Sequence, residues 1–460
     1  MSDKLQQRNQ LFEHAPVQKA VASMAVPTII SMLVVVVYNM ADTFFIGQTG
    51  DKLQIAAVSL ATPVFLLFMA LGNLFGIGGS SEIARSLGEK NEARAKRVSS
   101  FCCYASVITG LVMLLIYLFG MDGILKLICN NAAPVTIGYA REYLSYVAYG
   151  GVFIIFSVCF GNILRAEGAA KESMIGNMIG TIVNLVLDPV MILWLGWGVR
   201  GAAIATVIGN VCASIYYIHY LLRRPTVLSI RPSEFSAKKR IAVNVASIGI
   251  PASLNNILMS VSNIILNNFL IKYGDDQVAG MGVAMKLNML VVLLQIGLCT
   301  GVQPLIAYNY GAKNLKRLKS VMKFTALSAV VLGTFLTVIV VLLKGVLVKA
   351  FIDDQSVIEP GVRMTSALMI SGPVLGIMFT CINTLQGMGK ALPSLLLTIC
   401  RQGLVFVPML FLLNYFFQLD GIIYAQPIAD YVSIVFSILI CVHIVRKFEH
   451  SLAQETGKEV

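Results

Sequence analysis

The stretch Asn184-Leu-Val-Leu-Asp188-Pro189 decides how the chain is interpreted, because it places a carboxyl group inside an apolar run. Between residues 173 and 195, only two asparagines, one threonine and Asp188 interrupt a lipid-compatible segment. A carboxyl group there costs about 2.5–3.5 kcal/mol on insertion scales, so it usually faces a partner, a cavity or a transported ion. Asn184 and Asp188 share one helical face, and Pro189 frees the carbonyl of Leu185 one turn back. The stretch therefore indicates a cation site within a membrane.

The composition is that of a polytopic membrane protein. The 460 residues are 57% apolar and only 13% charged, and the mean hydropathy is +0.79. Soluble proteins are about 25% charged on average. The net charge of +12 comes from short basic clusters between apolar runs, which is typical of membrane orientation. We therefore expect a lipid bilayer as surroundings and no nucleic-acid partner.

The apolar runs predict an all-α bundle of twelve transmembrane helices. Each span needs about 20 mainly apolar residues, and only helices or closed barrels satisfy the backbone in lipid. The first six predicted spans are residues 17–45, 55–84, 98–119, 139–164, 173–195 and 201–222. The last six are residues 241–271, 278–308, 324–343, 364–385, 392–417 and 421–445.

The distribution of lysine and arginine predicts the orientation. With a cytoplasmic N-terminus and alternating spans, 25 basic residues lie in the inner segments or at the inner ends of spans, and eight lie in the outer segments or at the outer ends. This bias predicts that both termini are cytoplasmic. The predicted organisation is a first lobe at residues 1–222, a basic cytoplasmic linker at 223–240 and a second lobe at 241–460.

The two halves repeat each other with an offset of 219 to 224 residues. Matching positions are Pro27 and Pro251, Gly88 and Gly311, Asn91 and Asn314, Gly168 and Gly389, Pro189 and Pro408, and Asn210 and Asp430. Six spans in each half mean that both copies enter the membrane in the same direction. This predicts two lobes related by a pseudo-two-fold axis along the membrane normal, an arrangement that suits alternating access.

The candidate cation site combines residues of the first, fifth and sixth spans. Asp42 and Asp188 are expected at comparable depth in the outer half of the first lobe, with Thr206 nearby and Asn184 on the same face as Asp188. Carboxylate, amide and hydroxyl oxygens suit Na⁺ or a shared proton, because two close carboxylates cannot both stay charged without a cation. The alternative for either acid is a structural role, such as a hydrogen bond between helices.

Other polar features of the spans have two interpretations each. Pro27 is either a hinge of the first helix or a static kink. The seventh span carries a polar stripe that either lines a wet cavity or forms hydrogen bonds between helices. The residues predicted to line a cavity are Tyr38, Asn210, Ser253, Asn256, Ser260, Asn263 and Asn267.

The second half carries different ionisable groups. We interpret Lys286 and Asp430 as a neutralising pair, with Arg401 as a further basic residue within a span. The acidic site is thus confined to the first lobe. The chain has no Walker A sequence, no serine elbow and no metal-ligand pattern, so we expect neither an enzyme nor a cofactor. Without a nucleotide site, transport would draw on an ion gradient.

Taken together, Pro27, Ala41-Asp42, Asn184…Asp188-Pro189 and Gly201-Ala-Ala…Thr206 resemble multidrug and toxic compound extrusion (MATE) transporters. The resemblance is to the branch that includes the DNA-damage-inducible type and the staphylococcal multidrug exporter. It implies a monomeric antiporter of the bacterial inner membrane that exports lipophilic organic cations against H⁺ or Na⁺. It also implies that Asp42, Asn184, Asp188 and Thr206 form the first-lobe cation site, which would hold the Na⁺ if that is the coupling ion.

Two rival functions are weighed against the antiporter. A flippase for a lipid-linked anionic oligosaccharide, as in the same superfamily, would need clustered basic residues in the cavity, and only Lys286 and Arg401 lie in spans away from the span ends. A non-transporting membrane enzyme or scaffold would have no need of the repeat.

Overall fold

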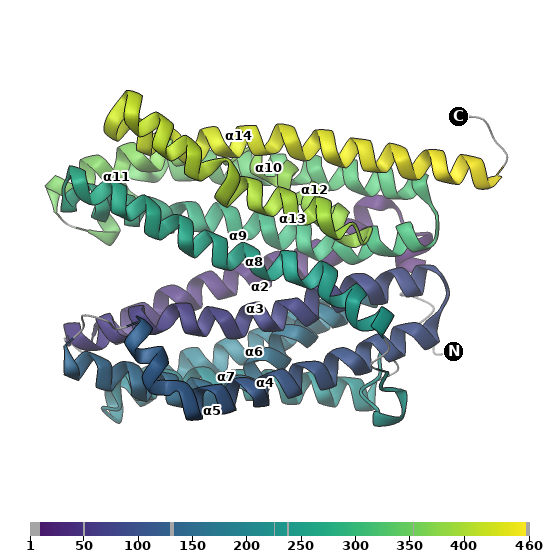
Figure 1. Cartoon of the computed structure of the whole chain (residues 1–460), viewed down its shortest axis with the longest axis horizontal. Helices are drawn as coiled ribbons and strands as arrows, with labels where there is room; N and C mark the ends of the chain where they lie inside the picture. The colour runs from purple at the N-terminus through teal and green to yellow at the C-terminus, as the bar shows by residue number, and fades with distance from the viewer. Residues whose placement is uncertain are drawn as a thin grey trace. The chain divides into compact units, whose positions relative to one another are not determined.

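The structure is a computed structural model that describes residues 10–48, 51–128, 133–224, 226–236, 239–352 and 354–456. These ranges are helical and contain no strand (Figure 1). The first half comprises α2 (Val17–Gly47), α3 (Lys52–Gly88), α4 (Glu92–Ile128), α5 (Pro134–Ala166), α6 (Ala170–Asp188), η1 (Pro189–Trp194), α7 (Gly198–Arg223) and η2 (Pro232–Glu234). The second half comprises α8 (Lys239–Leu270), η3 (Ile271–Tyr273), α9 (Asp275–Gly311), α10 (Leu315–Phe351), α11 (Gln355–Leu368), α12 (Leu375–Gly387), α13 (Ala391–Ile399), η4 (Cys400–Leu404) and α14 (Phe406–Thr456).

Ten stretches of the described chain are long and apolar enough to cross a membrane, which makes the chain a multi-pass membrane protein. The predicted count of twelve differs at two places. The predicted span 364–385 is divided between α11 and α12 by a turn that contains Pro373, which cannot continue a helix. The last two predicted spans fall in one 65-residue stretch, which is kinked at Gln418, where φ is +51°. The count of twelve stays a prediction.

The chain forms two compact units. Unit 1 consists mainly of residues 30–253, and unit 2 consists of residues 15–29 together with the chain from Leu254 onward. Helices α2 and α8 therefore each contribute to both units. The change from one unit to the other occurs after Ile29 in α2 and after Ser253 in α8, within a turn of Pro27 and Pro251. The lobe limits at residues 222 and 241 stay a prediction.

The repeat in the sequence is accompanied by a repeat in backbone geometry. Lys90 and Lys313 both have a positive φ, 57° and 55°, in the turns that follow α3 and α9. In each turn the next residue, Asn91 or Asn314, accepts a hydrogen bond from the backbone N–H three residues on, at 3.0 and 3.1 Å. The same side-chain cap thus starts α4 and α10.

The segment after α7 is fastened to unit 1. Thr226 donates to the buried carboxylate of Glu167 at 2.6 Å, and the Tyr104 hydroxyl donates to the Ile230 carbonyl at 3.1 Å. The ring of Phe235 meets the ring of Tyr104 edge-on, with centroids 5.3 Å apart. The described part of the predicted linker is therefore an ordered strap rather than a loose connector.

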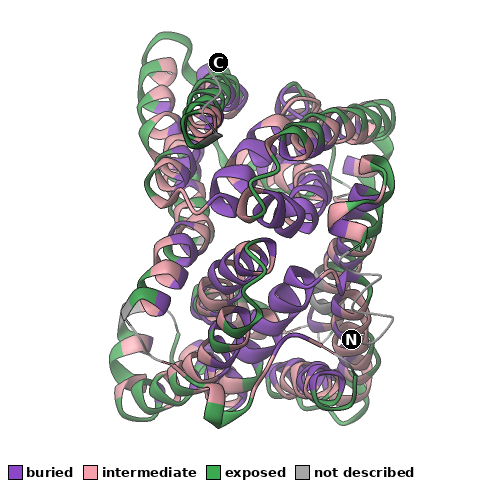
Figure 2. Ribbon diagram, turned by 90° about the vertical axis from the view of Figure 1, so that its right-hand side faces the viewer, coloured by how far each residue is buried: buried purple, intermediate pink, exposed green. Residues whose placement is uncertain are grey.

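Burial follows the expectation for helices in lipid. In each unit the buried residues lie mainly on the helix faces that turn toward other helices (Figure 2). The opposite faces carry exposed apolar side chains. On α10, for example, Leu327, Val331 and Phe335 are all about 60% exposed and stand four residues apart. A soluble protein rarely shows such a continuous apolar surface, whereas lipid solvates it.

Candidate cation site

The candidate site lies in unit 1, where α6 ends. Asp188 is the last residue of α6, and the chain continues from Pro189 as the wider π-helix η1. The N–H of Leu195 donates to the carbonyl of Val190, five residues back, at 2.9 Å. Proline removes one helical donor, and single π turns are frequent at functional sites. A loosened turn is therefore present beside Asp188, but on its C-terminal side; the free carbonyl at Leu185 stays a prediction.

The side chains of Asn184, Asp188 and Thr206 meet at this point. Asp188 is completely buried, and the other two are about 5% exposed. In the orientation that satisfies both neighbours, the Asn184 amide nitrogen donates to Asp188 Oδ2 at 3.3 Å. The Asn184 oxygen then accepts from the Thr206 backbone N–H at 2.9 Å. The hydroxyls of Tyr38 and Thr206 are 3.4 Å apart, so α2, α6 and α7 all contribute.

Asn210 and Ser157 extend this cluster along α7. The Asn210 amide donates to the Thr206 carbonyl at 2.8 Å, and its oxygen accepts from the Ser157 hydroxyl of α5 at 2.6 Å. Asn210 was predicted as a cavity-lining residue, and Ser157 was not predicted at all. Ser157 lies between apolar residues of α5 and has no polar residue three or four positions away, so its helical spacing contained no signal.

The arrangement has the chemistry of a small-cation or proton site. The neighbours Asn184 and Thr206 are neutral and offer oxygen atoms, and the carboxyl group of Asp188 is shielded from water. A buried carboxylate costs several kcal/mol unless a proton, a cation or hydrogen bonds compensate for its charge. A carboxyl group in such a place can therefore exchange one small cation for another.

Three predicted residues bear on this site less directly. The side chains of Asp42 and Asn256 lie outside the described residues, so the role of Asp42 stays a prediction. Pro27 lies inside the continuous helix α2, two residues before that helix passes from unit 2 to unit 1. Its role as a hinge also stays a prediction.

The polar stripe of α8 is divided between different surroundings. Ser253 is buried and donates to the Ala70 carbonyl of α3 at 2.7 Å, which is a hydrogen bond between helices. Ser260 and Asn263 are half-buried, and Asn267 is exposed. None of these side chains lines either of the two cavities described below.

The buried acid of unit 2 has a different partner from the predicted one. Asp430 is 1% exposed and accepts from Arg401 Nε at 2.9 Å. The pairing of Asp430 with Lys286 was therefore wrong: the Lys286 ammonium lies 5.7 Å from the ring centroid of Phe351. The reason is local geometry, because η4 widens the helix at Arg401 and directs the guanidinium toward α14.

The carboxylate of Asp430 has two further donors. Gln426, one turn earlier on α14, donates to it at 2.9 Å. Ser371 donates at 2.8 Å from the turn between α11 and α12. The turn that interrupts the predicted span 364–385 thus supplies a hydrogen-bond donor to Asp430.

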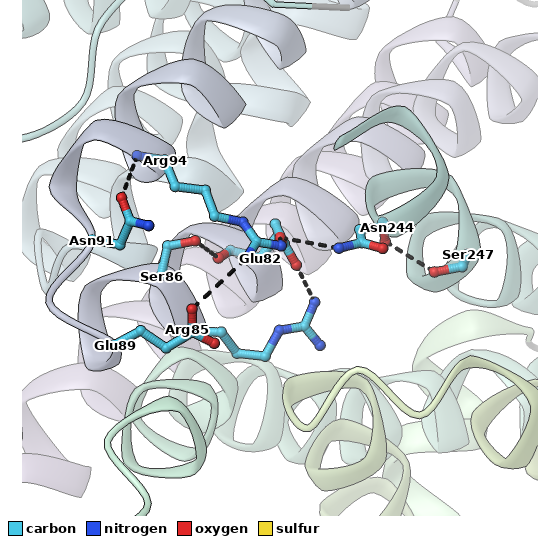
Figure 3. A network of polar contacts seen from close by, with 8 residues as sticks. All are labelled: Glu82, Arg85, Ser86, Glu89, Asn91, Arg94, Asn244 and Ser247. Atoms are coloured by element: carbon cyan, nitrogen blue, oxygen red, sulfur yellow. Dashed lines mark hydrogen bonds and ion pairs between the residues drawn. The ribbon is translucent and has the colours of Figure 1, made fainter. Parts of the chain in front are cut away.

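A second buried acid of unit 1, Glu82, was missed by the sequence reasoning. Glu82 is 2% exposed and forms ion pairs with Arg85 of α3 and Arg94 of α4. The Asn244 amide of α8 also donates to it, at 3.2 Å, so that three helices meet at one carboxylate (Figure 3). The available signal was an acid at the end of the predicted span 55–84 with an arginine three residues later.

The fold and the site together define a polytopic helical membrane protein with a buried polar cluster around a carboxyl group in its first unit. The chain belongs to the MatE family, whose family model matches residues 27–190 and a second time residues 251–412. The two matches begin at Pro27 and Pro251, the first pair of repeated residues found in the sequence.

Curated relatives cover almost the whole chain. The multidrug export protein MepA of Staphylococcus saprophyticus is 35% identical, over 93% of this chain and 94% of its own length. MepA of Staphylococcus aureus strain MRSA252 is also 35% identical, over 91% of this chain and 92% of its own length.

Solved structures show the same fold. An outward-facing multidrug resistance MATE family transporter of the MOP superfamily has a TM-score of 0.89 at 27% identity, over 96% of this chain and 98% of that one. A MATE crystal structure in complex with MaL6 has a TM-score of 0.91 at 26% identity, over 98% of this chain and 100% of that one.

Proposed function

We propose that this MATE transporter is a multidrug exporter that moves lipophilic organic cations out of the cell against an inward flow of H⁺ or Na⁺. The protein would act as a monomer in a bacterial inner membrane, with both termini in the cytoplasm. The similarity to the MepA proteins supports multidrug export. The repeat of two six-span halves suits alternating access.

The observation that carries this proposal is the complete burial of the Asp188 carboxyl group at the end of a membrane-span helix, beside an amide and a hydroxyl. Entry of a proton or Na⁺ at Asp188 would neutralise the carboxylate and favour one conformation. Release of that ion on the opposite side of the membrane would restore the charge of the carboxylate and favour the second conformation. An ion gradient would thereby drive the transport cycle.

A lipid-linked oligosaccharide flippase is not favoured. A pyrophosphate needs several available cationic side chains. Of the two basic residues predicted within spans, Lys286 and Arg401, the second is held by Asp430.

The test is ethidium efflux from proteoliposomes that contain the purified chain, with the pH gradient and the sodium gradient imposed separately. We expect one gradient to drive efflux in the wild-type protein and Asp188→Asn to abolish the driven component. Asp122→Asn is the matched control, because Asp122 is an exposed acid paired with Arg141, and it should export at the wild-type rate. Driven efflux by Asp188→Asn at the wild-type rate would show that the site is wrong.

A further inference from the structure

A groove in unit 2 lies apart from the acids discussed above. It has a volume of about 340 Å³ and lies between α10, α12 and α14. One end is lined by charged side chains and the other by apolar ones. The charged lining residues are Lys319, Lys323, Arg446 and Glu449, and the apolar wall includes Ala326, Ile377 and Val445.

The change from charged to apolar lining coincides with the ends of two predicted spans. The span 324–343 begins immediately after Lys323, and the span 421–445 ends immediately before Arg446. Ala326 and Val445 lie inside these spans. The groove therefore crosses the level at which lipid headgroups give way to acyl chains, and its lining changes in the same order.

The charged end is positive on balance, with three basic side chains and one acid. The Lys319 ammonium lies 2.6 Å from Glu449 Oε1, so these two charges largely compensate for each other. Lys323 and Arg446, which are both exposed, provide the excess positive charge. The groove thus offers two cations to an anion that arrives from the bilayer surface.

We propose that this groove is a binding site for an anionic phospholipid. The phosphate lies between Lys323 and Arg446, and one acyl chain follows the apolar wall past Ala326. From there the chain continues onto the exposed apolar ridge of α10 that starts at Leu327. Basic pockets between membrane helices at the headgroup level bind anionic headgroups through this combination of charge and apolar surface.

A second cavity shows what the charged end adds. It lies in unit 1 between α5 and α7 and has a volume of about 290 Å³. Its lining consists of Tyr146, Tyr149, Gly150, Phe153, Ile204, Val207 and Ile208 and includes no acidic or basic residue. Such a cavity accepts an acyl chain but cannot select a headgroup by its charge. The selectivity for anionic lipid therefore belongs to the groove in unit 2.

The test is native mass spectrometry of the full-length, delipidated protein titrated with phosphatidylglycerol or phosphatidylcholine. The wild-type protein should retain phosphatidylglycerol in preference. Lys323→Gln together with Arg446→Gln should weaken that binding about 25-fold, because each basic residue near an anionic surface contributes about 1 kcal/mol, or about fivefold. Glu449→Gln should strengthen it about fivefold by removing the one negative charge.

The matched control is Lys316→Gln together with Lys447→Gln. It removes two exposed positive charges from the same ends of α10 and α14, outside the groove lining, and should leave the binding unchanged. Equal retention of both lipids by the wild-type protein overturns the proposal, as does an equal loss in the two double variants. Displacement of phosphatidylglycerol by millimolar inorganic phosphate also overturns it, because the site would then take free phosphate. If Lys323→Gln/Arg446→Gln does not fold, two measurements still test the proposal. These are the preference of the wild-type protein for phosphatidylglycerol and the expected gain in binding of Glu449→Gln.

Discussion

Asp188 in unit 1 and Asp430 in unit 2 are equally buried acids with opposite surroundings. Asp188 accepts a hydrogen bond from the neutral amide of Asn184 at 3.3 Å, and the Asn184 oxygen accepts from the Thr206 backbone N–H. Asp430 receives the guanidinium of Arg401 at 2.9 Å and two further neutral donors. A carboxylate with a fixed counter-charge keeps its own charge and serves the structure. Burial alone therefore does not distinguish an exchange site from a structural acid, whereas a guanidinium partner such as that of Arg401 indicates the structural kind.

The repeat shows where the two units differ. Asp430 occupies the repeat position of Asn210, and both side chains accept a hydrogen bond from a serine of another element: Ser371 in the turn before α12, or Ser157 of α5. Unit 2 has a carboxylate where unit 1 has an amide, and it adds Arg401 to neutralise that charge. The same place in both units thus holds a polar cluster without a net charge. The additional acid of unit 1, Asp188, lies on α6, one helix away.

The largest effect is expected from Arg401→Leu. This change leaves Asp430 buried without its counter-charge, and breaking a buried pair in this way costs about 3–5 kcal/mol. We expect a corresponding fall in the free energy of unfolding, measured by denaturant titration of the purified protein in detergent. The double variant Arg401→Leu/Asp430→Leu removes both charges and should recover most of that loss. A double variant as unstable as the single one would mean that Arg401 acts through other contacts.

Asp188→Asn should have little effect on stability and a large effect on transport, unlike Arg401→Leu. An amide has nearly the same shape and needs no counter-charge, so the free energy of unfolding should change by less than about 1 kcal/mol. Ion-driven ethidium efflux, however, should fall at least about a hundredfold, which corresponds to about 2.7 kcal/mol. The measurement pairs efflux in proteoliposomes with the unfolding titration of the same preparation. A loss of stability as large as that of Arg401→Leu would remove the distinction between the two acids.

Local spacing made the core of the candidate site predictable, and tertiary packing hid the rest. Asn184 and Asp188 are neighbours because residues four apart share a helical face, and that spacing is visible in the sequence. The approach of Thr206 followed from the expected antiparallel course of two consecutive spans.

The partner of Asp430 was not predictable in the same way. Arg401 is 29 residues away, and a π turn decides its direction. The expected depth of each residue in the membrane, counted along straight helices, favoured Lys286 as the partner of Asp430. Such counting fails where η4 and the break near Pro373 change the rise and direction of the helices. The spacing of Glu82 and Arg85 was visible in the sequence, but the approach of Arg94 from α4 and Asn244 from α8 depends on tertiary packing.

Glu82→Gln tests whether an arginine partner, rather than membership of a unit, indicates a structural acid. Glu82 belongs to unit 1 but is paired with two arginines, as Asp430 is with one. Its neutralisation should lower the free energy of unfolding by about 1.5–3 kcal/mol, the usual value of hydrogen bonds to a charged group. The efflux rate per folded protein should remain that of the wild type.

Glu89→Gln is the matched control for Glu82. Glu89 faces the same Arg94 across 3.8 Å, with its side chain 47% exposed, and such pairs contribute less than about 1 kcal/mol. If Glu82→Gln abolished driven efflux while leaving the unfolding curve unchanged, Glu82 would belong with Asp188 and the contrast drawn from pairing would be wrong.

The smallest effect is expected from Thr206→Val, which removes one hydroxyl from the neighbourhood of Asp188. The Thr206 backbone N–H still holds the Asn184 oxygen, so the cluster should keep its shape while it loses one oxygen. One hydrogen-bonding group contributes about 1 kcal/mol, so the half-maximal concentration of the driving ion should rise about fivefold. Ser214→Ala removes a buried hydroxyl from the same helix, one that donates to the Phe153 carbonyl at 3.2 Å, and should leave that concentration unchanged. Both variants lose one buried hydroxyl of α7. If Thr206→Val and Ser214→Ala show the same ion dependence, the Thr206 hydroxyl has only a structural role, and the exchange site of unit 1 is restricted to α6.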